Sequence, residues 1–138
     1  MAGFDAAKRA RAIARMNRLP EAVKRNVRAQ MNTNAEELTA MQKRLAPKDD
    51  GTLAGTVRHS DISNEERIAV KVEAGGPATT RPVRQGADAS YDYALAIEHG
   101  REGQKAQPFF FPAYRAQRKK FKSRVSRAAK KGIAEALG

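Results

Sequence analysis

Residues 106–124 read AQPFFFPAYRAQRKKFKSR, so three consecutive phenylalanines lie between two prolines and directly precede a strongly basic run. Pro112 suits the first turn of a helix, because its ring fixes φ and its missing N–H would have no partner there. Beyond it, apolar residues recur at helical spacing: Phe121, Val125, Ala129, Ile133 and Leu137. The stretch therefore predicts an extended segment that turns into a basic C-terminal helix. At least some of Phe109, Phe110 and Phe111 are expected to anchor this helix to a sheet.

Two further helices are predicted upstream of this stretch. The longer one begins at Pro20 and is ended by Pro47, and its apolar residues share one face: Val23, Val27, Met31, Leu38, Met41 and Leu45. A shorter helix, within residues 1–18, is predicted from an N-cap at Asp5 to about Asn17.

The middle of the chain changes to an alternating pattern. Residues 66–74 (ERIAVKVEA) and 91–100 (YDYALAIEHG) alternate larger apolar residues with polar or small ones, which predicts two half-buried strands. A shorter strand is predicted at residues 56–62. Residues 75–90 contain several Gly and Pro and one sizeable aliphatic residue, and they are expected to form a long mobile loop. Arg81 and Arg84 are its expected contact residues for carboxylates on a partner.

The predicted order is therefore two helices, three strands and a helix, without alternation of strands and helices. This order favours a single α+β domain over residues 1–138. Its small, mostly antiparallel sheet would be packed by the long N-terminal helix and the basic C-terminal helix.

Charge is distributed unevenly along the 138 residues, whose net charge is +12. Residues 1–30 carry 8 Lys and Arg against 2 acids, residues 31–100 carry 8 against 11, and residues 101–138 carry 11 against 2. Such segregation indicates an anionic partner: nucleic acid, a membrane surface or an acidic protein. The candidate contacts on the C-terminal helix are Lys119, Lys120, Lys122, Arg124, Arg127 and Lys131. Phosphate binding by them would be salt-dependent and blind to sequence, and the alternative is a solvated face.

Residues for catalysis or metal binding are sparse. There is no cysteine, and the two histidines, His59 and His99, are far apart in the sequence. No phosphate-binding loop is present. Asp49 and Asp50 before Gly51 are explained by a tight turn better than by a cation site. We therefore expect no enzymatic activity, metal or cofactor, and the lack of a long apolar run favours a soluble intracellular protein without a membrane partner.

Three segments, taken in order, resemble the tail-component family of long-tailed phages, which comprises head–tail connector, neck and tail-completion proteins. They are LAPKDDGTLAGTV (45–57), YALAIEHG (93–100) and AQPFFFPA (106–113), and LPEAVKRNVRAQM (19–31) fits the usual helix start of that family. His99 and the pair Ala54–Gly55 depart from its pattern. The resemblance rests on these positions, which we expect to be structural anchors: Pro47, Gly51, Leu53, Tyr93, Glu98, Gly100, Pro108, Phe109, Phe110, Phe111 and Pro112.

The resemblance implies a structural protein that forms a ring, of six copies, between head-closure proteins and the tail tube, with the genome passing through it. Its partners would be other copies of itself, head-closure and tail-tube or tail-terminator proteins, and double-stranded DNA bound without sequence specificity. It would belong to the virion neck or tail and be assembled in the cytoplasm of a bacterial host. Two alternatives stay open: a tail terminator ring, and a small basic protein that binds nucleic acid without sequence specificity.

Overall fold

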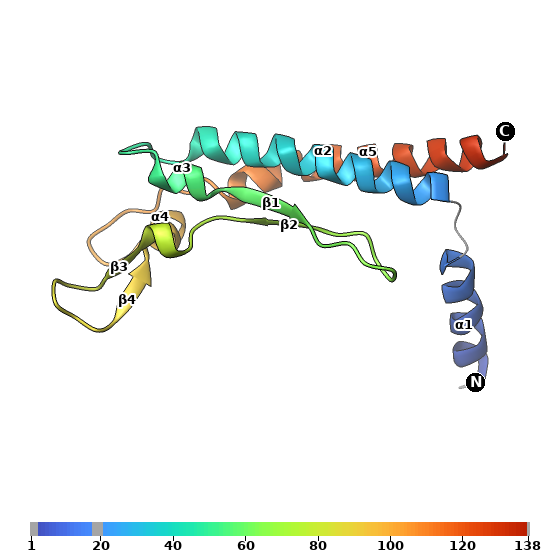
Figure 1. Ribbon diagram of the computed structural model, residues 1–138, viewed down its shortest axis with the longest axis horizontal. Coiled ribbons are helices and arrows are strands. Elements are labelled where there is room, and N and C mark those ends of the chain that lie inside the picture. The colour runs from blue at the N-terminus through green and yellow to red at the C-terminus, as the bar shows by residue number, and fades with distance from the viewer. Residues whose placement is uncertain (1–2, 18–20, 138) are drawn as a thin grey trace.

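The computed structural model describes residues 3–17 and 21–137 and has the predicted α+β class (Figure 1). The helices are α1 (Gly3–Asn17), α2 (Glu21–Leu45), α3 (Thr52–Thr56), α4 (Tyr93–His99) and α5 (Phe111–Leu137), with a 3-10 turn η1 (Pro77–Thr79). The strands are β1 (Arg58–Asp61), β2 (Val70–Glu73), β3 (Thr80–Pro82) and β4 (Ser90–Asp92). They form two antiparallel pairs, β1–β2 and β3–β4, rather than one sheet. Across the described ranges, no helix combines the length and apolarity needed to cross a bilayer.

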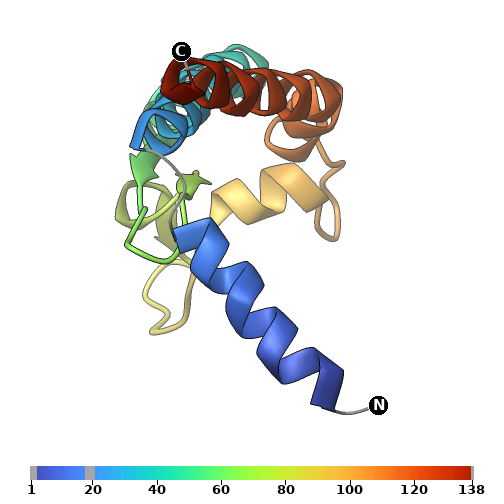
Figure 2. The ribbon, with the colours of Figure 1, turned by 90° about the vertical axis from the view of Figure 1, so that its right-hand side faces the viewer.

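The long helices α2 and α5 lie side by side and antiparallel, so the start of α2 is next to the end of α5 (Figures 1 and 2). Leu38 of α2 packs against Ala113 and Phe121 of α5, and Val72 of β2 packs against this cluster. Both helices were predicted. Two residues of the predicted stripes, Leu45 and Ile133, are instead 46% and 44% exposed. Each is near the C-terminal end of its helix, and Ala46 is buried just beyond the end of α2.

Helix α1 was also predicted, and it begins two residues before the expected Asp5. It projects away from the rest of the chain in both views (Figures 1 and 2). Pro20, the predicted first residue of the long helix, lies outside the described residues.

Gly132 allows α5 to approach the backbone of α2. A Cβ at this position would lie 2.6 Å from the Cα of Val23, and backbone atoms cannot rotate away as a side chain can. Although alanine favours helices, we expect Gly132→Ala to lower the free energy of unfolding by about 1 to 3 kcal/mol, because overpacking forces the backbones apart. Gly55→Ala is the matched control, since its Cβ would meet nothing within 4 Å. Urea denaturation that finds Gly132→Ala as stable as the parent would contradict this packing.

The first strand pair agrees with the predicted positions but is shorter. In β1–β2, Arg58 is opposite Glu73 and Asp61 is opposite Val70. The helix α3 was not predicted, because the preceding residues have the composition of a turn. Gly51 has φ +81° at its start, and Leu53 and Thr56 are buried. This helix connects the end of α2 to β1.

The predicted strand at residues 91–100 is wrong beyond Asp92, where the chain becomes helix α4. The Asp92 carboxylate accepts a hydrogen bond from the Ala94 N–H, as an N-cap does, and Gly100 at φ +79° follows the last helical residue. Ala94 and Glu98, four residues apart, are the buried residues of the helix. A short apolar run suits a strand or a buried helix equally, so here the caps decide the structure.

The predicted loop at residues 75–90 contains regular structure at both ends. After η1, strand β3 pairs with β4, with Thr80 opposite Asp92 and Pro82 opposite Ser90. Hydrogen bonds rather than apolar burial hold this arrangement: Asp92 accepts from the Gly76 N–H and from the Thr79 hydroxyl. Hydropathy alone could not show these bonds. Residues 83–89 connect the two strands, and Val83 is 59% exposed.

The hydrogen bonds to Asp92 make stability depend on pH. Burial raises the pKa of Asp92, but the bonds from Thr79, Ala94 and Gly76 outweigh it and hold the pKa below its usual value. A carboxyl with a lowered folded-state pKa stabilises the fold above its unfolded pKa, and this contribution is lost as the pH falls through the folded value. When the pH falls below about 4, the free energy of unfolding should therefore decrease less for Asp92→Asn than for the parent. Melting curves at a series of pH values check this, and parallel pH profiles would contradict it.

Candidate assembly surfaces

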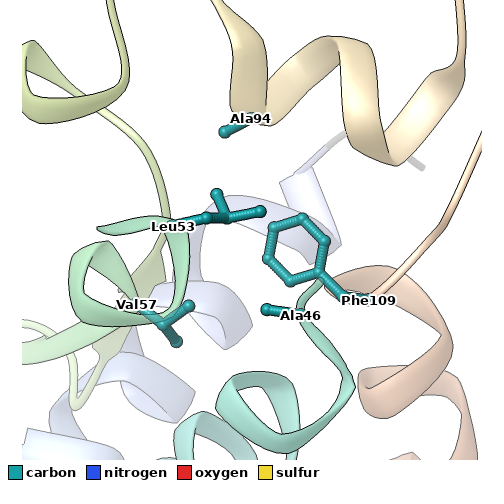
Figure 3. Packing of buried hydrophobic residues seen from close by; sticks show 5 residues of the cluster. All are labelled: Ala46, Leu53, Val57, Ala94 and Phe109. Atoms are coloured by element: carbon teal, nitrogen blue, oxygen red, sulfur yellow. The ribbon is translucent and has the colours of Figure 1, made fainter. Parts of the chain in front are cut away.

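The three segments that carry the family resemblance meet in one hydrophobic core. Its buried members are Ala46, Leu53, Val57, Ala94 and Phe109. Figure 3 shows the Phe109 ring beside Leu53, with Ala46 and Ala94 on either side of the pair. The first three residues come from 45–57, Ala94 from 93–100 and Phe109 from 106–113. Segments that are far apart in the sequence therefore build a single structural unit.

Glu98 fixes the connection from this core to α5. Its side chain is buried, and its carboxylate accepts hydrogen bonds from the N–H groups of Phe109 at 2.9 Å, Phe110 at 2.8 Å and Phe111 at 3.2 Å. A carboxylate is favourable here, because the Phe111 N–H lies in the first turn of α5, where N–H groups lack partners within the helix and carry partial positive charge. Glu98 thus holds the chain just before α5 through these hydrogen bonds, and it lies on a helix rather than on the predicted strand.

The phenylalanines divide into one core residue and two at its edge. Phe109 is 1% exposed, Phe110 is partly buried, and Phe111 is 45% exposed. Phe109 is therefore the buried member of the three, and its role as an anchor stays a prediction. Its cluster includes Leu53 of α3, Ala94 of α4 and Ala46 just beyond α2, and no buried member of the cluster lies on a strand.

The remaining expected anchors differ in their surroundings. Leu53 is buried, Tyr93 packs against the core, and Pro47 and Pro112 are partly buried. Gly100 approaches another segment closely, since a Cβ there would lie 3.0 Å from the Ala106 nitrogen. Gly51 supplies the positive φ before α3. Pro108 is exposed, so nothing in its packing explains an anchoring role.

The six basic candidates on α5 do not form one patch. Glu37 of α2 accepts a hydrogen bond from Arg124 and lies 3.9 Å from the Lys120 ammonium group. The bond from Arg124 lowers the pKa of Glu37 below its usual value. Arg124, Arg127 and Lys131 border one seam between α2 and α5. Lys119 and Lys122 instead line a groove described below.

The loop candidates Arg81 and Arg84 differ in their contacts. The Arg81 guanidinium donates to the carbonyls of Ala78 and Thr80, and it stacks over Tyr93 with its central carbon 5.4 Å from the ring centroid. Arg101 stacks in the same way over Tyr91, at 5.3 Å, and lines the same cleft as Arg81. Sequence reasoning missed Arg101, because residue spacing gave no sign of the stacking.

Arg84 lies on the exposed connection between β3 and β4. Within the described part of the chain, its side chain has no hydrogen bond or ion pair. It therefore stays available for a partner, whereas Arg81 is already held by its own chain.

An open groove with a volume of about 950 Å³ lies between α2, β2 and the first half of α5. We call it the α5 groove. Its walls include Met31 and Leu38 of α2, Val70 and Val72 of β2, and Phe111 and Tyr114 of α5. Phe111 and Tyr114 are 45% and 41% exposed. Such large apolar side chains in an open groove are typical of a contact surface.

Gln42 of α2 lines this groove and is fully buried. Its amide nitrogen donates to the Phe110 carbonyl at 3.1 Å, which connects α2 to the start of α5. Its Oε1 atom has no hydrogen-bond partner in the described part of the chain. The sequence analysis missed Gln42, because it is polar and does not contribute to the apolar periodicity of the helix.

The described residues contain no cluster of metal-ligating side chains. Within 3–17 and 21–137, no three His, Asp or Glu side chains gather in a way that could hold a metal ion. Asp50 accepts a hydrogen bond from the Thr52 N–H, and this bond holds the pKa of Asp50 below its usual value. That contact fits the predicted turn before α3.

Comparisons with protein-family models, curated proteins and solved structures gave no match to this chain.

Proposed function

We propose that the chain is a structural subunit of the head–tail connector of a long-tailed phage or phage-like particle. Copies of it, six in number, would form a ring between the head-closure proteins and the tail tube. The observation that carries this proposal is the convergence of the three resembling segments on the core around Phe109. A resemblance limited to local turns would not require these segments to pack together, whereas a shared fold would.

The surface supports an assembly role. The α5 groove exposes apolar side chains, and basic residues of α5 line two separate surfaces. The cations at the seam with α2, Arg127 and Lys131, would contact the phosphates of passing DNA without sequence specificity. The groove would contact protein. A ring subunit needs both kinds of contact. In this proposal the protein is assembled in the host cytoplasm and resides in the neck of the virion.

A second candidate is a small basic protein that binds nucleic acid without sequence specificity. It is favoured by the exposed cations of α5 at Arg127, Lys130 and Lys131 and by the net charge of +12. This function would need neither the α5 groove nor self-association. It predicts a monomer or dimer whose retention on DNA or RNA falls steeply with salt.

Deletion of the coding gene in a particle-producing strain, followed by electron microscopy, tests the connector role. We expect DNA-filled heads and separate tails of normal length, and restored joining when the gene is supplied in trans. Overlong tail tubes would assign the chain to the tail terminator ring instead. Normal joined particles from the deletion strain would contradict both ring assignments.

A further inference from the structure

The α5 groove has a basic rim. Arg118, Lys119 and Lys122 line it, and all three are exposed. In the described part of the chain none of them forms an ion pair or a side-chain hydrogen bond, in contrast to Arg124 and Lys120, which meet Glu37. An apolar groove with unpaired cations at its edge favours an occupant that combines apolar side chains with carboxylates.

The chain itself carries a segment of this chemistry at the tip of the β1–β2 hairpin, residues 62–68. Ile62 is 41% exposed, and the neighbouring Glu65 and Glu66 are exposed without an ion-pair partner in the described structure. Arg67 follows as a single cation. Figure 1 shows this tip as a narrow loop that extends beyond the paired strands.

The tip is held in shape before any contact is made. Asn64 accepts hydrogen bonds from the N–H groups of Glu66 at 2.8 Å and Arg67 at 3.0 Å, and the Ile62 N–H donates to the Ala69 carbonyl at 2.9 Å. An element that is already ordered loses little conformational entropy on binding.

Helix α1 also projects from the body, but Lys8, Arg9 and Arg11 would bring like charge to the basic rim.

We propose that the hairpin tip of one copy docks in the α5 groove of the next copy. Ile62 would enter the apolar groove, and Glu65 and Glu66 would face Lys119 and Lys122. Because tip and groove are different surfaces, the contact is heterologous, and repeated contacts of this kind close into a ring when the rotation per subunit allows it. The inference rests on the proposed ring and names the two surfaces that build it.

Charge reversal on each surface, followed by reversal on both, tests the contact. Mass photometry would compare the full-length parent with E65K/E66K, with K119E/K122E and with the variant that carries all four changes. Each double reversal should raise the dissociation constant for self-association at least about 100-fold, because like charges then oppose each other. The variant that carries all four changes should regain self-association. All four positions are exposed, so melting temperatures should stay close to the parent and exclude misfolding as the cause.

Cross-linking gives a second measurement that does not depend on charge. The chain has no cysteine, so Arg67→Cys at the tip and Ser126→Cys at the groove introduce unique thiols. With a short bismaleimide, the variant carrying both should give a ladder of covalent oligomers, whereas either single variant should give no species beyond a dimer. The docking is wrong if the parent forms rings, the charge reversals leave self-association unchanged and the variant with both thiols gives no species beyond a dimer. In that case the ring proposal stands. If no oligomer of the parent forms at all, the ring itself is contradicted.

Discussion

Phe109→Ala is expected to lower the free energy of unfolding by about 3 to 5 kcal/mol, the largest loss for any single side chain in the described structure. Phe109 is 1% exposed and belongs to the core cluster in which all three resembling segments are represented. Removal of its ring would leave a cavity between α3, α4 and the end of α2. A domain of this size has a total stability of about 5 to 15 kcal/mol, so the variant should be partly unfolded at physiological temperature.

Phe111→Ala is the matched control, since the same change is made two residues away on a side chain that is 45% exposed. We expect it to lower stability by less than about 1 kcal/mol, because little apolar surface returns to water. Urea denaturation of the two variants separates core packing from surface effects. Equal stability of Phe109→Ala and the parent would show that the core is not built around this ring.

Glu98→Ala is expected to have the next largest effect, on the order of 3 kcal/mol, because three backbone N–H groups at and just before the start of α5 lose their acceptor. Glu98→Gln should cost less, since its amide oxygen still accepts hydrogen bonds. The order of stability should therefore be parent, Glu98→Gln, Glu98→Ala. The connection between α4 and α5 should also exchange its amide hydrogens faster in both variants.

Glu102→Ala controls for the loss of a nearby negative charge, because Glu102 is exposed. It should change stability by no more than about 0.5 kcal/mol. If Glu98→Ala and Glu102→Ala were equally stable, the carboxylate of Glu98 would have no role in holding α5.

The long helices could be predicted from the sequence because their apolar periodicity extends over many turns. Helix α4 could not be predicted, because a run as short as YDYALAIEHG is compatible with a strand or a helix. The Asp92 cap and the burial of Glu98 favour the helix, and both arise only in the folded chain. Residues 75–90 were predicted as a loop for a related reason. Their order comes from hydrogen bonds to Asp92, which residue composition does not reveal.

The candidate surfaces were predicted only in part. Exposure of Lys119 and Lys122 follows from the helical pattern, but the pairing of Arg124 with Glu37 joins residues 87 positions apart, and periodicity carries no information about such a contact. The α5 groove likewise depends on how β2 packs beneath two helices. Arg101 and Gln42 were missed because their contacts, with Tyr91 and with the Phe110 carbonyl, arise only in the folded chain.

The central claim, that this chain is a subunit of a ring, is tested most directly by the mass and shape of the purified protein at physiological salt. Mass photometry combined with negative-stain electron microscopy should find a defined oligomer, with six copies, and annular particles with a central channel. Its population should rise with protein concentration and persist after nuclease treatment. A monomer or dimer at every concentration, with salt-sensitive retention on DNA or RNA, would contradict the ring and support the nucleic-acid-binding function instead.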